Sequence, residues 1–144
     1  MLDYLLKAFS LWFLGFVPFA EIIIAVPAGL AMGLDQVSVI IFSVAGNFTP
    51  VLLIEYGYTL LMRYQKIRLW LNRYTSERAA ANINKYGLWY MLVITPWVGV
   101  WAMGAMAKML NMPRKTFMWG AFISILVYAV VIVVLVEVGT GLFP

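Results

Sequence analysis

The 144-residue sequence contains no cysteine and no histidine. The missing thiols and imidazoles exclude disulfides, thiolate or imidazole metal sites and a histidine proton relay. Proton chemistry inside the protein would therefore fall to its six carboxylates. The sequence also shows no nucleophile–base pair, metal-ligand set or phosphate-binding loop, so we expect neither an enzyme nor a cofactor.

Charge is scarce along the whole chain. Charged residues make up 11% and hydrophobic residues 65%, whereas an average soluble domain has about 25% and about 45–50%. This composition indicates an integral membrane protein, and the length fits a single transmembrane domain over residues 1–144. We attribute the net charge of +4 to cytoplasmic loops, so the expected partner is the lipid bilayer and not nucleic acid.

The first apolar stretch, residues 8–34, carries a single charge, Glu21. Pro18 and Pro27 lie on either side of Glu21 and interrupt an α-helix by removing amide donors. Broken backbone persists in hydrocarbon only where protein or water satisfies it, so this stretch predicts a re-entrant hairpin. An ionisable residue at that depth indicates a functional site, which makes Glu21 the main candidate for proton or cation coupling. The alternative is a partly wetted acid near the hairpin mouth.

The second apolar run, residues 37–62, is long enough to cross a bilayer with some tilt. Pro50 is expected to kink this helix. Asn47 and Thr49 would then either line a cavity or bond to backbone groups that the kink frees. Glu55 is the only charge in the run. Asn47 and Glu55 are further candidates for the transport and ion-coupling site, the alternative for Glu55 being a structural pair with a cytoplasmic arginine.

Residues 63–85 form the only strongly polar segment, with six basic residues against one acid. Four apolar residues recur in it at helical spacing: Ile67, Trp70, Leu71 and Tyr74. This pattern predicts an amphipathic linker helix that lies at the cytoplasmic interface, although a solvated loop is the alternative.

The second half of the chain repeats the order of a broken run followed by a continuous one. Residues 86–107 are uncharged and broken near Thr95 and Pro96, and residues 116–136 form a plain spanning segment. Two tryptophans of the broken run, Trp97 and Trp101, could either stack on a substrate or pack against the rest of the protein. The residues assigned to hairpin turns and the cavity are Pro18, Pro27, Thr49, Pro50, Thr95, Pro96, Trp97, Gly99 and Trp101.

The distribution of basic residues predicts the topology. If all four apolar runs crossed the membrane, three of the ten basic residues would lie outside, against the positive-inside tendency. If both broken runs re-enter, nine of the ten lie in cytoplasmic loops. We therefore expect an all-α protein with two re-entrant hairpins and two spans in the cell membrane. Residues 1–62 and 86–144 would be inverted repeats, and four plain spans are the alternative.

Several short motifs carry a family resemblance. Ala20-Glu21 with Ala25-Val26-Pro27 and Gly33 resembles the acidic, Ala-x-Pro, Gly pattern of the small multidrug export proteins. Gly46-Asn47 with Pro50 is similar to that family's second motif. In the second half, the matching motifs are Lys85-Tyr86-Gly87, Thr95-Pro96, Gly99 and the region from Gly104 to Phe117.

That family is in turn similar to the DedA membrane proteins, which implies a fold of two re-entrant hairpins with spanning helices. The DedA resemblance also implies movement of polyprenyl-phosphate or other lipids and proton-dependent physiology. One departure concerns the second hairpin, because no arginine follows Pro96 where DedA proteins have a basic residue. An anionic lipid headgroup is therefore a less secure substrate.

The sequence as a whole predicts a small secondary transporter, proton-coupled through Glu21, that moves a small amphipathic compound or a lipid carrier. One alternative is a DedA-like lipid flippase or scramblase without strict ion coupling, and another is a structural or assembly membrane protein. A homodimer is expected, because two hairpins and two spans leave little protein to cover non-helical backbone.

Overall fold

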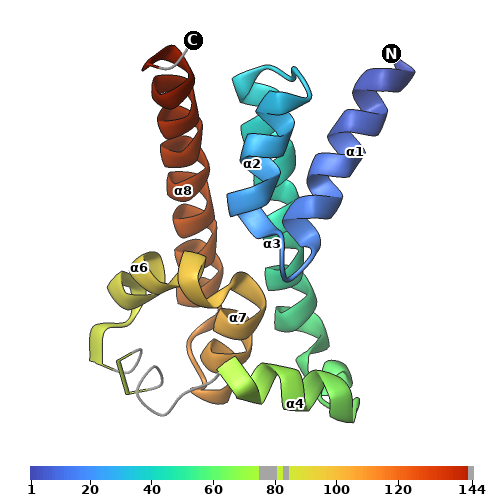
Figure 1. The fold of residues 1–144 in the computed structure, drawn as a ribbon. Helices are drawn as coiled ribbons and strands as arrows, with labels where there is room; N and C mark the ends of the chain where they lie inside the picture. Colours follow the sequence, from blue (N-terminus) through green and yellow to red (C-terminus); the bar gives the residue numbers. More distant parts are fainter. Residues whose placement is uncertain (75–80, 83–84, 143–144) are drawn as a thin grey trace. The chain divides into compact units, whose positions relative to one another are not determined.

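The computed structural model describes residues 1–74, 81–82 and 85–142, and these are helical without strands, as expected for an all-α protein (Figure 1). The chain divides into two compact units, one of residues 1–48 and 125–144 and one of residues 49–124. The helices are α1 (Leu2–Phe16), α2 (Glu21–Ala31), α3 (Gln36–Leu61), α4 (Gln65–Tyr74), α6 (Leu88–Val98), α7 (Val100–Met109) and α8 (Arg114–Leu142).

Two of the described helices, α3 and α8, are long and apolar enough to cross a membrane. They coincide with the two continuous apolar runs of the sequence, and α8 extends that run at both ends to 29 residues. The broken runs form pairs of shorter helices, α1 with α2 and α6 with α7. The long and short helices thus follow the predicted order along the chain.

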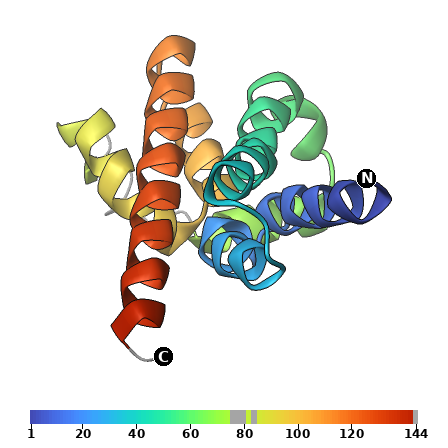
Figure 2. The ribbon, with the colours of Figure 1, turned by 90° about the horizontal axis from the view of Figure 1, so that it is seen from above.

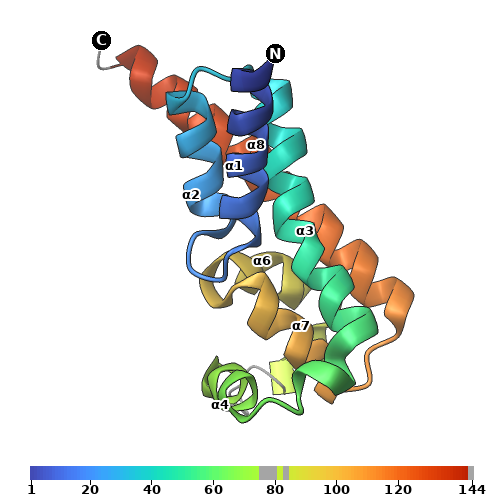
Figure 3. The same ribbon diagram turned by 90° about the vertical axis from the view of Figure 1, so that its right-hand side faces the viewer.

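In the first unit, α1 and α2 form a helical hairpin beside the first half of α3 (Figures 2 and 3). The hydroxyl of Tyr4, near the start of α1, lies 2.8 Å from the Ser38 hydroxyl near the start of α3. The end of α2 is joined to α3 by only four residues, 32–35. The hairpin therefore begins and ends at the same end of α3.

The turn of this hairpin lies partway along α3. A Cβ placed on Gly15 would approach the Ser43 carbonyl oxygen to 2.7 Å, and one on Gly46 would approach the Trp12 carbonyl oxygen to 2.1 Å. The two backbones therefore touch directly at these glycines. Gly46 lies about 15 Å from the start of α3, a helix of 26 residues and about 39 Å.

The connection from α2 to α3 is tight and is held by hydrogen bonds at both ends. Gly33 takes a left-handed φ of 75°, which only glycine adopts without strain. The Gly33 amide donates a hydrogen bond to the Leu30 carbonyl, and the Leu34 amide donates to the Gly29 carbonyl. Hydrogen bonds of this kind satisfy the last carbonyls of a helix. Asp35 then caps α3 by accepting the Ser38 amide at 2.9 Å and the Ser38 hydroxyl at 2.6 Å.

In the second unit, α6 and α7 are separated only by Gly99, whose φ is 88°. Helix α7 is buried along most of its length and packs against α4. The absence of a side chain at Gly104 allows close contact with Ile54 of α3 and Phe117 of α8. Helix α4 corresponds to the first part of the predicted amphipathic linker. Residues 75–80 and 83–84 of that linker lie outside the described residues.

We expect Gly46→Ala to destabilise the protein by about 1–3 kcal/mol or more, because the new methyl group meets backbone that cannot move aside. Gly57→Ala on the same helix is the matched control, since a Cβ there meets nothing within 4 Å. That control should be neutral or slightly stabilising. Thermal unfolding midpoints in detergent measure both variants, and equal midpoints would contradict the close packing of α1 on α3.

Candidate functional site

Glu21 is the first residue of α2 and lies at the turn of the first hairpin. The residue is 7% exposed, and its φ of 47° is in the left-handed region. Such a backbone costs a non-glycine residue about 1–3 kcal/mol and persists only where the surrounding structure imposes it. The α2 N-terminus also places the positive end of a helix dipole at this carboxylate. Glu21 is thus a buried acid on strained backbone.

Asn47 lies on α3 at the level where the end of α1 packs. The residue is 1% exposed, and its side-chain oxygen has no hydrogen-bond partner among the described residues. A buried polar atom without a partner is unfavourable by about 1–3 kcal/mol. Glu21 and Asn47 are thus two buried polar groups of the same unit.

The prolines assigned to the hairpin regions have different structural roles. Pro18 lies in the turn between α1 and α2, whereas Pro27 and Pro50 lie inside α2 and α3. A proline within a helix leaves the carbonyl four residues earlier without its amide donor. For Pro50 that carbonyl belongs to Gly46, at the contact with α1.

The remaining predicted turn and cavity residues fall in the second unit. Thr95 is buried, Pro96 lies inside α6, and Gly99 forms the break before α7. Trp97 is 84% exposed, whereas Trp101 is half-buried. Thr49 and Pro50 also belong to this unit. The structure therefore divides the predicted site between its two units, with Glu21 and Asn47 in the first.

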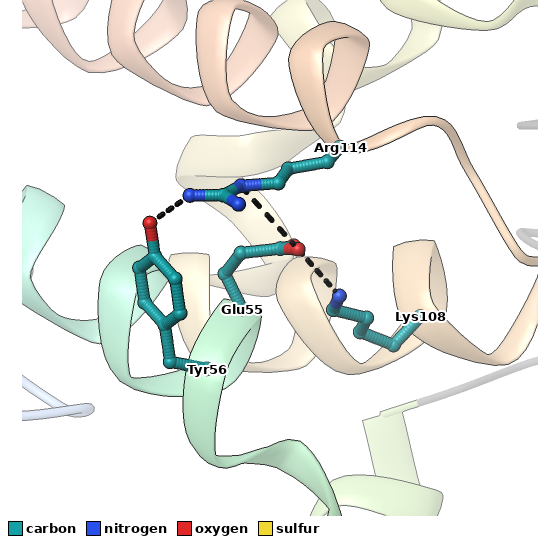
Figure 4. Close-up of polar contacts among 4 residues, drawn as sticks. All are labelled: Glu55, Tyr56, Lys108 and Arg114. Carbon is teal, nitrogen blue, oxygen red and sulfur yellow. Dashed lines mark hydrogen bonds and ion pairs between the residues drawn. The ribbon is translucent and has the colours of Figure 1, made fainter.

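A second polar site surrounds Glu55 near the end of α3 (Figure 4). The Glu55 carboxylate is 7% exposed and lies 2.7 Å from Lys108 Nζ and 3.9 Å from Arg114 Nε. The Arg114 guanidinium also donates to the Tyr56 hydroxyl and stacks 4.6 Å from the centre of that ring. The other Glu55 oxygen has no hydrogen-bond partner among the described residues. Three helices, α3, α7 and α8, are thus joined through one carboxylate.

The sequence indicated that Glu55 would have a basic partner but not which one. Arg63 follows Glu55 in the chain and is exposed, whereas the observed partners are Lys108 near the end of α7 and Arg114 at the start of α8. These two residues and Tyr56 were missed as site residues. The only available signal was the basic cluster of residues 108–115, whose distance from Glu55 in the sequence gave no indication of contact.

Two helices with the length and composition of membrane spans, together with a buried acid at a helix break, are typical of a helical membrane protein. Residues 21–131 match the family described as "Putative small multi-drug export protein". This match covers more than half of the chain, so the protein belongs to that family, as the resemblance of its motifs indicated. No curated protein and no solved structure matches the chain.

A double-mutant cycle tests the geometry around Glu55. Glu55→Gln combined with Lys108→Gln should give a coupling energy of about 1–3 kcal/mol, because this pair is short and mostly buried. When Glu55→Gln is combined with Arg114→Gln, the coupling energy should be below about 1 kcal/mol, because the Glu55–Arg114 contact is long and Arg114 is half-exposed. Chemical unfolding in detergent gives these energies. Zero coupling to Lys108, or a stronger coupling to Arg114, would contradict the observed arrangement.

Proposed function

We propose that this protein is a secondary transporter in which Glu21 couples substrate movement to a proton or another cation. The observation that carries the proposal is a nine-tenths-buried carboxylate on strained backbone at the turn of a hairpin. Family membership supports an export role. The proposed substrate is a small amphipathic compound or a lipid carrier, which is consistent with the family description and the apolar composition.

The physical basis of coupling is the balance around the Glu21 carboxylate. Burial favours its neutral form, whereas the amides at the α2 N-terminus favour its charged form. When two such terms oppose each other, a modest change in hydration or ligand contact changes the occupancy by a proton or cation. A transporter uses this change to link ion binding to the exposure of its site.

Contacts within each unit support a re-entrant topology. In the first unit, α1 and α2 begin and end beside the start of α3. In the second, Glu55 lies six residues before the end of α3 and pairs with Arg114, the first residue of α8. The chain thus leaves α3 and enters α8 at the same end, so α6 and α7 together would form a second re-entrant hairpin with inverted orientation.

Lipid translocation of the DedA type, without strict ion coupling, is the second candidate function. Trp97 favours it, because this large apolar side chain is 84% exposed beside the break between α6 and α7. A tryptophan at such a position would contact acyl chains and could guide a lipid past the hairpin. A role in assembly alone would show neither transport nor lipid exchange.

We expect Glu21→Gln to fold normally, because the change is nearly isosteric, but to lose gradient-driven transport in proteoliposomes. Exchange without a gradient can persist, since only the coupling group is removed. Drug-like cations and labelled lipids, each followed with and without a pH gradient, measure the two activities. Asp3→Asn at the exposed start of α1 is the control. Full activity of Glu21→Gln together with loss in Glu55→Gln would transfer the coupling role to α3.

The absence of cysteine in the sequence allows a direct topology test with single introduced thiols. Cysteines in place of Gln65 and Asn111 should react with an impermeant reagent from the cytoplasmic side only. A cysteine in place of Gln36 should react from the other side, because α3 crosses between Gln36 and Gln65. Labelling of positions 65 and 111 from opposite sides would exclude a re-entrant second half.

We also infer a homodimer. The small residues Gly120, Ala121 and Ser124 of α8 are buried within the single chain. Because these residues are buried, they are not accessible to a second chain. The partner would instead contact the exposed apolar face of α8 that includes Val127, Val131 and Val134. Mass measurement in nanodiscs should give twice the chain mass of 16.3 kDa after the lipid is accounted for. A fully active monomer would contradict the inference.

A further inference from the structure

An open pocket of about 720 Å³ lies in the first unit, lined by the second half of α2, the start of α3 and the last turns of α8. Its volume falls in the range of about 300–1,000 Å³ that is usual for small-molecule sites. Much of its wall is apolar and comes from all three helices: Pro27, Leu30, Leu34, Val37 and Val136. Such a wall would bury the hydrocarbon part of a ligand.

The polar part of the same pocket is acidic. Asp35 and Glu137 line it, and none of the described lining residues is basic. Helices α2 and α8 both end near the pocket, at Ala31 and Leu142, and helix C-termini carry partial negative charge. Helix α3 contributes an N-terminus, but Asp35 already caps it. The electrostatic potential of the pocket is therefore negative.

The Asp35 carboxylate is held in a fixed position. Ser38 donates to it from both its hydroxyl and its backbone amide. These hydrogen bonds hold the pKa of Asp35 below its ordinary value, so the carboxylate stays ionised throughout the physiological pH range. A ligand at this pocket would meet a permanent negative charge beside an apolar wall.

We propose that this acidic pocket, formed around Asp35 and Glu137, binds amphipathic monocations, such as quaternary ammonium or phosphonium ions with apolar bodies. Its role as a capture site for substrate rests on the proposed transport function. The apolar wall alone would accept any lipid tail, but the two carboxylates give a cation an attraction that neutral and anionic molecules lack. The pocket therefore selects by charge among ligands of similar shape.

Direct binding to the full chain in zwitterionic nanodiscs, without any gradient, tests this proposal. Tetraphenylphosphonium is the cationic probe, and tetraphenylborate has nearly the same shape with the opposite charge. We expect the cation to bind at least tenfold more tightly than the anion after subtraction of uptake by empty nanodiscs. Glu137→Gln and Asp35→Asn should each weaken cation binding by about fivefold, the loss of one near Coulomb attraction in water. Asparagine still caps α3, so the fold is retained.

Two further variants separate this proposal from the transport function. Asp3→Asn removes an exposed carboxylate of the same unit outside the pocket and should bind the cation as the parent does. Glu21→Gln is followed for coupled transport, which it should lose. Unchanged cation binding in Glu137→Gln and Asp35→Asn, or equal binding of the two probes, would overturn the pocket proposal while leaving the transport role intact. Normal coupled transport in Glu21→Gln, together with the expected binding pattern, would overturn the transport role of Glu21 and leave the pocket proposal intact.

Discussion

The contact between the backbones of α1 and α3 is the constraint on which the first unit depends. A hairpin that turns within an apolar region exposes amides and carbonyls that lipid cannot satisfy. Gly15 and Gly46 let the end of α1 lie directly on α3, so that the two backbones touch. The buried Asn47 lies at this close approach, since a Cβ on Gly15 would meet its backbone nitrogen at 2.9 Å. A methyl group at Gly46 would force the backbones of α1 and α3 apart.

The carboxylates of the chain are distinguished by their surroundings. Glu55 is neutralised by Lys108 and Arg114 and so joins α3 to the end of α7 and the start of α8. Asp35 serves as a helix cap and keeps its charge at the surface. Glu21 alone is buried at a helix break on strained backbone. That combination of burial and strain is the reason to assign coupling to Glu21 and structural support to Glu55.

The sequence predicted the helical elements well, because apolar runs, prolines and glycines are local signals. The first break lies near Pro18, where the pattern placed it, and the continuous runs became α3 and α8. The second break lies at Gly99, whereas the sequence placed it near Thr95 and Pro96, which are inside α6. The partners of Glu55 were not predictable, since Lys108 and Arg114 come from a segment more than fifty residues away. The left-handed conformation of Glu21 and the pocket beside Asp35 also depend on tertiary packing. No local pattern encodes either feature.

We propose that the turn between α1 and α2 lies deep in the membrane and not at either surface. A nitroxide at Phe19, an exposed side chain in that turn, measures this depth through its accessibility to oxygen and to a water-soluble nickel complex in nanodiscs. A second label at Gln36, the start of α3, marks the membrane surface. The account predicts high oxygen and low nickel accessibility at Phe19, with the reverse at Gln36. Equal nickel accessibility at the two positions would place the turn at a surface and contradict it.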